Sequence, residues 1–192
     1  MTESNLKLRM MIVTALFAAI IGVLAQVTIP LPLVPITGQT LAIGLAATIL
    51  GAKYGTISVL VYLGLGAVGI PVFAQMSGGL GSLFGPTGGF LFGFIPTAFI
   101  IGYYLEKTSF TVANAIIANV IGMFVALTFG TVWLKVIANL SWTGAIMGGF
   151  VPFIFVGVIK AALAAWVGIT VRDRLKSANL LYVGRTKNYF TR

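Results

Sequence analysis

The sequence contains no cysteine and no histidine, and only three acidic residues in 192 positions. It therefore offers no disulfide, no thiolate nucleophile, no imidazole base and no metal site built from Cys or His. It also lacks a G-x-x-x-x-G-K-[ST] phosphate-binding loop and a cluster of carboxylates that would hold Mg²⁺. These absences exclude most enzyme chemistry, so we expect no catalytic residues, no resident metal and no cofactor.

Charged residues are scarce as well. They make up 8% of the chain, against about 25% in a typical soluble domain, and hydrophobic residues make up 59%. So few charges cannot cover a globule of this length, and we predict a single membrane-embedded domain over residues 1–192. The net charge of +9 does not indicate nucleic-acid binding, because the basic residues are scattered singly between apolar runs.

Six apolar segments reach or approach the length of about 20 residues that a membrane-spanning helix needs. They cover residues 10–27, 36–50, 54–68, 88–105, 111–136 and 152–171. We interpret the first as a retained helix and not a signal peptide, because it is long and similar segments follow it. The predicted fold class is an all-α integral membrane protein with six transmembrane helices.

The charged residues outside these segments test that count. The three loops 28–35, 69–87 and 138–151 contain no charged residue. The basic residues outside the spans all fall on the other side, among them Lys7, Arg9, Lys53, Lys107, Arg172, Arg174, Lys176, Arg185 and Lys187. Because short cytoplasmic loops accumulate Lys and Arg, we place both termini in the cytoplasm and the uncharged loops on the exported side.

Two lysines lie inside predicted spans, and neither has an acidic residue nearby in its span. A lysine at the centre of a membrane costs about 2.5 to 3.5 kcal/mol and is by default a functional candidate. Lys160 lies about 12 Å along its helix from Pro152, whereas Lys135 lies near a span end, from which it can reach the interface. Lys160 either bonds to backbone carbonyls of a loop or pairs with an anionic ligand, such as a carboxylate.

The exported loops are rich in Pro, Gly and large apolar residues. They are either interfacial connectors or segments that fold over a cavity, where irregular backbone is tolerated. Polar and aromatic side chains in or beside them are candidates for ligand contact, although helix–helix bonding and packing explain such residues equally well. The candidates, besides Lys160, are Thr37, Gln39, Gln75, Thr87, Asn119, Phe73, Phe90 and Trp133.

Three stretches are more specific. Residues 32–41 read PLVPITGQTL, residues 62–74 read YLGLGAVGIPVFA, and residues 85–94 read GPTGGFLFGF. In this order they resemble the BioY family, the biotin-specific S components of energy-coupling factor (ECF) transporters. A fourth stretch, residues 152–160, matches a family pattern resembling P-F-x-P-G-D-x-x-K at Lys160 but departs from it at residues 155–157.

The resemblance implies a six-helix subunit of the bacterial cell membrane that binds biotin near the exported face. Such a subunit works with a transmembrane coupling protein and two ATPase subunits, which agrees with the missing phosphate-binding loop. In the family a small-residue stripe on the first helix contacts the coupling protein, which here falls on Ala15 and Ala19; internal packing is the alternative. Two rival functions are an S component for another small anionic vitamin and a membrane subunit without a transport role.

Overall fold

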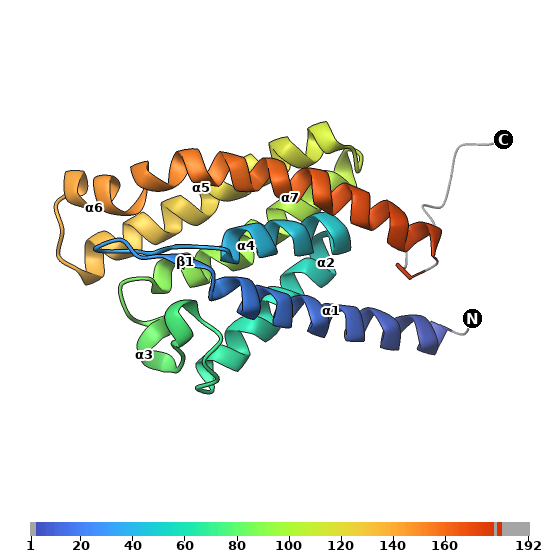
Figure 1. The fold of residues 1–192 in the computed structure, drawn as a ribbon, viewed down its shortest axis with the longest axis horizontal. Coiled ribbons are helices and arrows are strands. Elements are labelled where there is room, and N and C mark those ends of the chain that lie inside the picture. The colour runs from blue at the N-terminus through green and yellow to red at the C-terminus, as the bar shows by residue number, and fades with distance from the viewer. Residues whose placement is uncertain (1–2, 179, 182–192) are drawn as a thin grey trace.

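The computed structural model describes residues 3–178 and 180–181, so Arg185 and Lys187 lie outside the described part. The chain is helical throughout, apart from one short hairpin and the connecting loops (Figure 1). The elements in chain order are α1 (Glu3–Ala25), β1 (Thr28–Ile29), β2 (Ile36–Thr37), α2 (Gln39–Ala67), the 3-10 turn η1 (Ala74–Met76), α3 (Leu80–Leu83), α4 (Gly88–Lys107), α5 (Val112–Ile137), α6 (Trp142–Gly149) and α7 (Val151–Ser177).

Helix α2 is broken in its middle, and the break produces the sixth pass across the bundle. Gly51 has φ 80° and ψ −174°, a combination that glycine alone adopts readily. Figure 1 shows α2 turning back sharply, so that its two limbs, 39–50 and 52–67, run as separate helices. Among the described residues five helices are long and apolar enough to cross a membrane, and the two limbs of α2 bring the passes to six, as predicted.

The backbone groups freed at this break are bonded by side chains from two other helices. The N–H of Ala52 donates to Oε1 of Glu106 on α4 at 2.8 Å. The guanidinium of Arg172 on α7 donates to the carbonyl of Ile49 and lies over the Phe110 ring, 3.5 Å from its centroid. The break therefore ties α2, α4 and α7 together at one end of the bundle.

The two ends of the bundle differ in character. The start of α1 and the end of α7 lie at one end, and the β1–β2 hairpin, α3 and α6 lie at the other (Figure 1). Helix α6 lies within residues 138–151, which the sequence indicated to be an exported loop. It begins where the Ser141 hydroxyl accepts a hydrogen bond from the Gly144 N–H at 3.1 Å, which caps its first turn.

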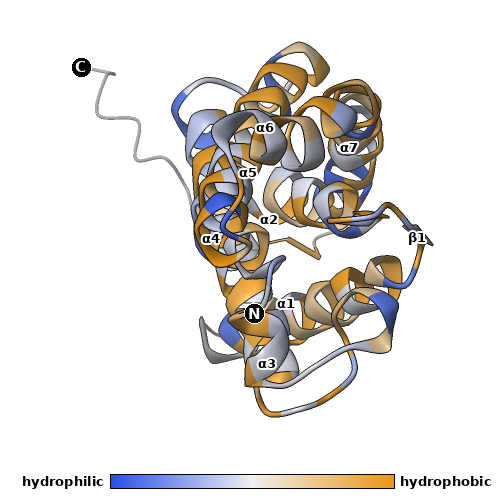
Figure 2. Cartoon of the chain, turned by 90° about the vertical axis from the view of Figure 1, so that its left-hand side faces the viewer, coloured by the Kyte–Doolittle hydropathy of each residue, from blue (hydrophilic) through white to orange (hydrophobic). Residues whose placement is uncertain are grey.

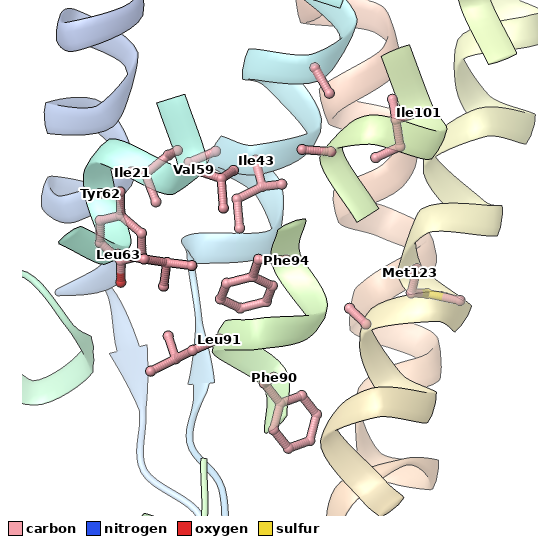
Figure 3. Packing of buried hydrophobic residues seen from close by; sticks show 14 of the residues in the cluster. Ile21, Ile43, Val59, Tyr62, Leu63, Phe90, Leu91, Phe94, Ile101 and Met123 are labelled. Carbon is pink, nitrogen blue, oxygen red and sulfur yellow. The ribbon is translucent and has the colours of Figure 1, made fainter. Parts of the chain in front are cut away.

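Apolar side chains occupy both the inside and the outside of the bundle. Figure 2, which looks at the hairpin end, shows hydrophobic residues on most sides of the helices. Phe155 and Trp166 on α7 are 76% and 63% exposed, as expected for side chains that face lipid. Inside, Leu91 and Phe94 of α4 point toward Tyr62 and Leu63 on the second limb of α2 (Figure 3). This inner layer ends at a cavity near the hairpin.

Candidate ligand-binding cavity

A cavity of about 140 Å³ lies at the hairpin end, among segments that are far apart in the sequence. Its walls come from the chain around β2 and the start of α2, the loop around η1, and helices α4, α5 and α7. Seven of the predicted ligand-contacting residues line it: Thr37, Gln39, Phe73, Gln75, Thr87, Phe90 and Lys160. The structure thus brings together the two sequence signals, the lysine within a span and the uncharged exported loops.

Lys160 lies on α7 and links that helix to the hairpin. Its ammonium donates a hydrogen bond to the carbonyl oxygen of Thr37 at 2.6 Å. Within the described part of the chain no carboxylate forms an ion pair with this ammonium. An ammonium has three N–H donors, so two remain for other acceptors. The two interpretations of this lysine are therefore compatible, since it bonds to a loop carbonyl and still lines the cavity.

Beside the lysine, a short chain of hydrogen bonds fixes the orientation of Gln39. The hydroxyl of Thr37 donates to Oε1 of Gln39 at 2.7 Å, and Nε2 of Gln39 donates to the hydroxyl of Tyr62. Tyr62 is fully buried, and its ring packs edge-on against Phe73 with centroids 5.5 Å apart. Each hydrogen bond restricts rotation of the Gln39 side-chain amide, so its remaining donor and acceptor positions point in one direction.

Tyr62 does not line the cavity but holds Gln39 in place, and the sequence did not identify it. It stands at the start of the 62–74 stretch that carries the family resemblance, yet it lies in an apolar run. A tyrosine buried in such a run needs a partner for its hydroxyl, and this requirement is the signal that could have identified it.

Most of the remaining cavity wall is apolar, although Thr40, Ser77 and Ser82 also line it. Phe90, Leu91 and Phe94 reach it from α4, and Phe90 also stacks at a tilt on Phe153 of α7, with centroids 6.1 Å apart. Figure 3 shows Phe90 pointing toward α5, where Met123 completes this side. An apolar chamber with a cation and an oriented amide at one margin suits a ligand that has an apolar body, a polar head and an anionic end.

Two predicted site residues lie outside the cavity lining. The indole N–H of Trp133 donates to the carbonyl of Gly85 at 2.9 Å, so this side chain anchors the loop before α4. Asn119 is only 4% exposed and donates to the hydroxyl of Thr48 at 3.0 Å and to the carbonyl of Ala115 at 2.8 Å. It joins α5 to α2 within the bundle, the alternative that the sequence left open for buried amides.

The small residues of α1 divide between two faces of that helix. Ala15 and Ala19 are exposed, whereas Ala18 and Gly22 are buried. A Cβ on Gly22 would lie 3.3 Å from Cβ of Val72, so this face packs against the loop before η1. The first pair is free for another protein, and the second pair serves internal packing.

Comparison with known proteins identifies the family of this chain. The sequence model of the BioY family matches residues 1–177. The chain belongs to the BioY family. Its BioY relatives include the "Biotin transporter BioY2" of Lactococcus lactis subsp. cremoris, which is 42% identical and aligned over 91% of this chain and 96% of the relative. Another, the "Biotin transporter BioY" of Thermotoga maritima, is 41% identical over 86% of this chain and 96% of the relative.

The fold of a solved structure agrees with this BioY assignment. That structure is described as the crystal structure at 2.1 Å of the S-component for biotin from an ECF-type ABC transporter. It matches this chain with a TM-score of 0.81 and 31% identity, over 90% of this chain and 95% of its own. The chain is thus a multi-pass membrane protein of the BioY family and not an enzyme.

Proposed function

We propose that this protein is the biotin-binding S component of a bacterial vitamin transporter. The observation that carries the proposal is Lys160, a cation without a carboxylate partner among the described residues, which lines an apolar cavity in a BioY-family chain. Biotin has an apolar ring and side chain, a polar ureido head and a terminal carboxylate. The cavity offers a counterpart to each of these parts.

The binding mode follows from the placement of the lining residues. Lys160 pairs with the valerate carboxylate, using the N–H donors that Thr37 leaves unused. Phe73 and Phe90 pack against the ring system, and Gln39, Gln75 or Thr87 bonds to the ureido group. Gln39 is the best oriented of these three, because the hydroxyls of Thr37 and Tyr62 both hold it.

The partners of the proposed transporter are a transmembrane coupling protein and two ATPase subunits. The sequence has no phosphate-binding loop, so the energy for uphill transport comes from those subunits. Ala15 and Ala19, exposed on α1, form the contact with the coupling protein. Apart from Lys135 and Lys160, the basic residues of the described part lie near the start of α1, the break of α2, the end of α4 and the end of α7. These ends lie opposite the hairpin (Figure 1), which supports an exported position for the cavity.

The test is equilibrium binding to the purified full-length protein. Isothermal titration with biotin, thiamine and riboflavin should give saturable binding of biotin alone. Absence of biotin binding to protein that elutes as a single folded species would refute the proposal. Binding of another anionic vitamin in its place would replace the ligand and leave the S-component assignment intact.

A further inference from the structure

One wall of the cavity is a turn with an unfavourable backbone. Residues 73–77 contribute Phe73, Gln75 and Ser77 to the lining. Gln75 and Met76 have φ values of 58° and 55°, so two consecutive residues other than glycine adopt the left-handed conformation. Such residues are strained, and they persist only where their surroundings hold them in place. Something outside the turn must therefore stabilise its shape.

The side chain of Gln26, the residue after α1, supplies contacts to both arms of this turn. Its Nε2 lies 3.0 Å from the carbonyl of Phe73 and 3.3 Å from that of Val72, and also donates to Gly22 at 3.0 Å. Its Oε1 accepts a hydrogen bond from the N–H of Met76 at 2.9 Å. One amide thus bonds the residues before the strained pair and a member of that pair.

Other contacts also stabilise the turn, and each of them acts on a different part of it. The N–H of Phe73 bonds to the carbonyl of Ser77 at 2.9 Å, which closes the turn on itself. The Phe73 ring packs on Tyr62 and Gly66, which anchors the arm nearest α2. Among the described side chains, Gln26 is the one that bonds the backbone N–H of Met76. Loss of its amide would free the tip of the turn, where Gln75 lines the cavity.

We propose that Gln26 is a positioning residue for biotin binding, which holds the turn at residues 73–77 closed over the cavity and so determines how slowly bound biotin leaves. The inference rests on the proposed function, and Gln26 does not touch the ligand. Its effect is on the dissociation rate, because opening of the turn uncovers the bound ligand. The association rate should stay the same or rise, since an open turn does not obstruct entry.

The first experiment compares dissociation rates in the full-length protein. Protein loaded with tritiated biotin is chased with excess unlabelled biotin for the wild type, Gln26→Met and Thr128→Val. Methionine keeps the length of glutamine but forms none of its hydrogen bonds, and we expect release to accelerate about tenfold or more. Thr128 bonds only within α5, away from the turn, so Thr128→Val should match the wild type.

A covalent replacement for the amide tests whether the effect acts through the turn. The chain has no cysteine, and a Cβ on Gly22 would lie 3.3 Å from that of Val72. This distance is slightly below the range of about 3.5 to 4.5 Å found in disulfides, so a small outward shift of the loop brings the pair into bonding geometry. In the Gln26→Met background, the oxidised pair Gly22→Cys and Val72→Cys should slow release in part, because it replaces the attachment of Gln26 to the arm at Val72 and Phe73 but not its bond to Met76. Dithiothreitol should reverse this slowing. A general loss of structure would lower the number of binding sites and would not respond to reduction in this way.

The outcomes separate this inference from the proposed function. Absence of biotin binding to the wild type would overturn both. Binding to the wild type, with release from Gln26→Met within about twofold of it, would overturn this inference alone. Release from the oxidised pair in the Gln26→Met background as fast as from its reduced form would also overturn it. If Gln26→Met does not fold, the cysteine pair is introduced into the wild-type protein as a second test. Oxidation of the pair should then slow the release of biotin relative to the reduced form, and equal release rates would overturn the inference.

Discussion

The ammonium of Lys160 lies 2.6 Å from the carbonyl oxygen of Thr37, although 123 positions separate the two residues in the chain. This bond joins the middle of α7 to the last residue of β2 at the margin of the cavity. An ammonium held by one neutral carbonyl remains short of a counter-ion, and the carboxylate of a ligand would supply it. The first prediction follows from this relationship.

Lys160→Ala should weaken biotin binding while leaving the protein folded in detergent. Removing one partner of a buried charge pair typically costs about 2 to 5 kcal/mol, a loss of about thirtyfold to several thousandfold in affinity. Isothermal titration measures this loss directly. The matched control is Lys135→Ala, because Lys135 lies over the Trp142 ring at 5.1 Å and outside the cavity lining, so affinity should hardly change.

A biotin derivative with a neutral amide in place of the carboxylate identifies the group that Lys160 contacts. This derivative should bind the wild type weakly and lose little more on Lys160→Ala. An equal loss of affinity for both ligands would show that the lysine acts through the hairpin or the ureido head, contrary to the proposed pairing.

Tyr62→Phe should reduce biotin affinity by about tenfold, because it removes the hydroxyl that receives the Gln39 amide proton. The phenylalanine ring keeps the contact with Phe73, so the change isolates the hydrogen bond. A buried donor left without a partner costs about 1 to 3 kcal/mol, part of which appears as a lower melting temperature. Titration and thermal unfolding measure the two effects. Unchanged affinity at a lower melting temperature would limit Tyr62 to a structural role.

Replacing Ala15 and Ala19 together by leucine should weaken assembly with the coupling protein and leave biotin binding intact. Both alanines are exposed on α1, and leucines there prevent close approach of a partner helix. Co-purification with a tagged coupling protein measures assembly. Ala113→Leu, at an exposed alanine on α5, is the control that should assemble normally. If the double variant assembles fully, α1 does not form the interface with the coupling protein.

Gly51→Ala should destabilise the protein by more than about 2 kcal/mol. Its φ and ψ values lie where residues with a Cβ are strained, and the added Cβ would collide with Oε1 of Glu106. Gly64→Ala in the same helix is the control, because its Cβ meets nothing within 4 Å, and alanine should be neutral or stabilising there. Thermal unfolding in detergent compares the two, and equal melting temperatures would contradict this role of Gly51.

The fold could be predicted from sequence because a membrane imposes simple rules on it. Long apolar runs and the one-sided placement of residues such as Lys53 indicated six spans, and the structure agrees with that count once the two limbs of α2 are taken separately. The break at Gly51 could not be foreseen, since the chain has 24 glycines and most of them sit in ordinary helical or turn conformations. Its effect depends on Glu106 and Arg172, which reach it from distant helices.

The site was predictable where chemistry alone marks a residue. Lys160 stood out because a charge in an apolar run is costly. Trp133 and Asn119 were placed in the site by residue type, but type does not determine which way a side chain points from its helix. Gln26 and Tyr62 were missed because neither residue type is unusual at its place in the sequence. The role of Gln26 depends on the turn that it contacts, and the role of Tyr62 depends on Gln39.

The break at Gly51 divides α2 into two limbs that are also joined to each other by a side-chain hydrogen bond. Gln39 lies twelve residues from the break, a lever of about 18 Å along one limb, and Tyr62 lies at a similar distance along the other. Each degree of rotation between the limbs would shift the two side chains relative to each other by about 0.3 Å at that radius. The Gln39–Tyr62 bond therefore joins the two limbs near the cavity, just as Glu106 and Arg172 bond the backbone at the break. A ligand that bonds to Gln39 would therefore contact the amide that links the two limbs of α2, about 18 Å from the break at Gly51.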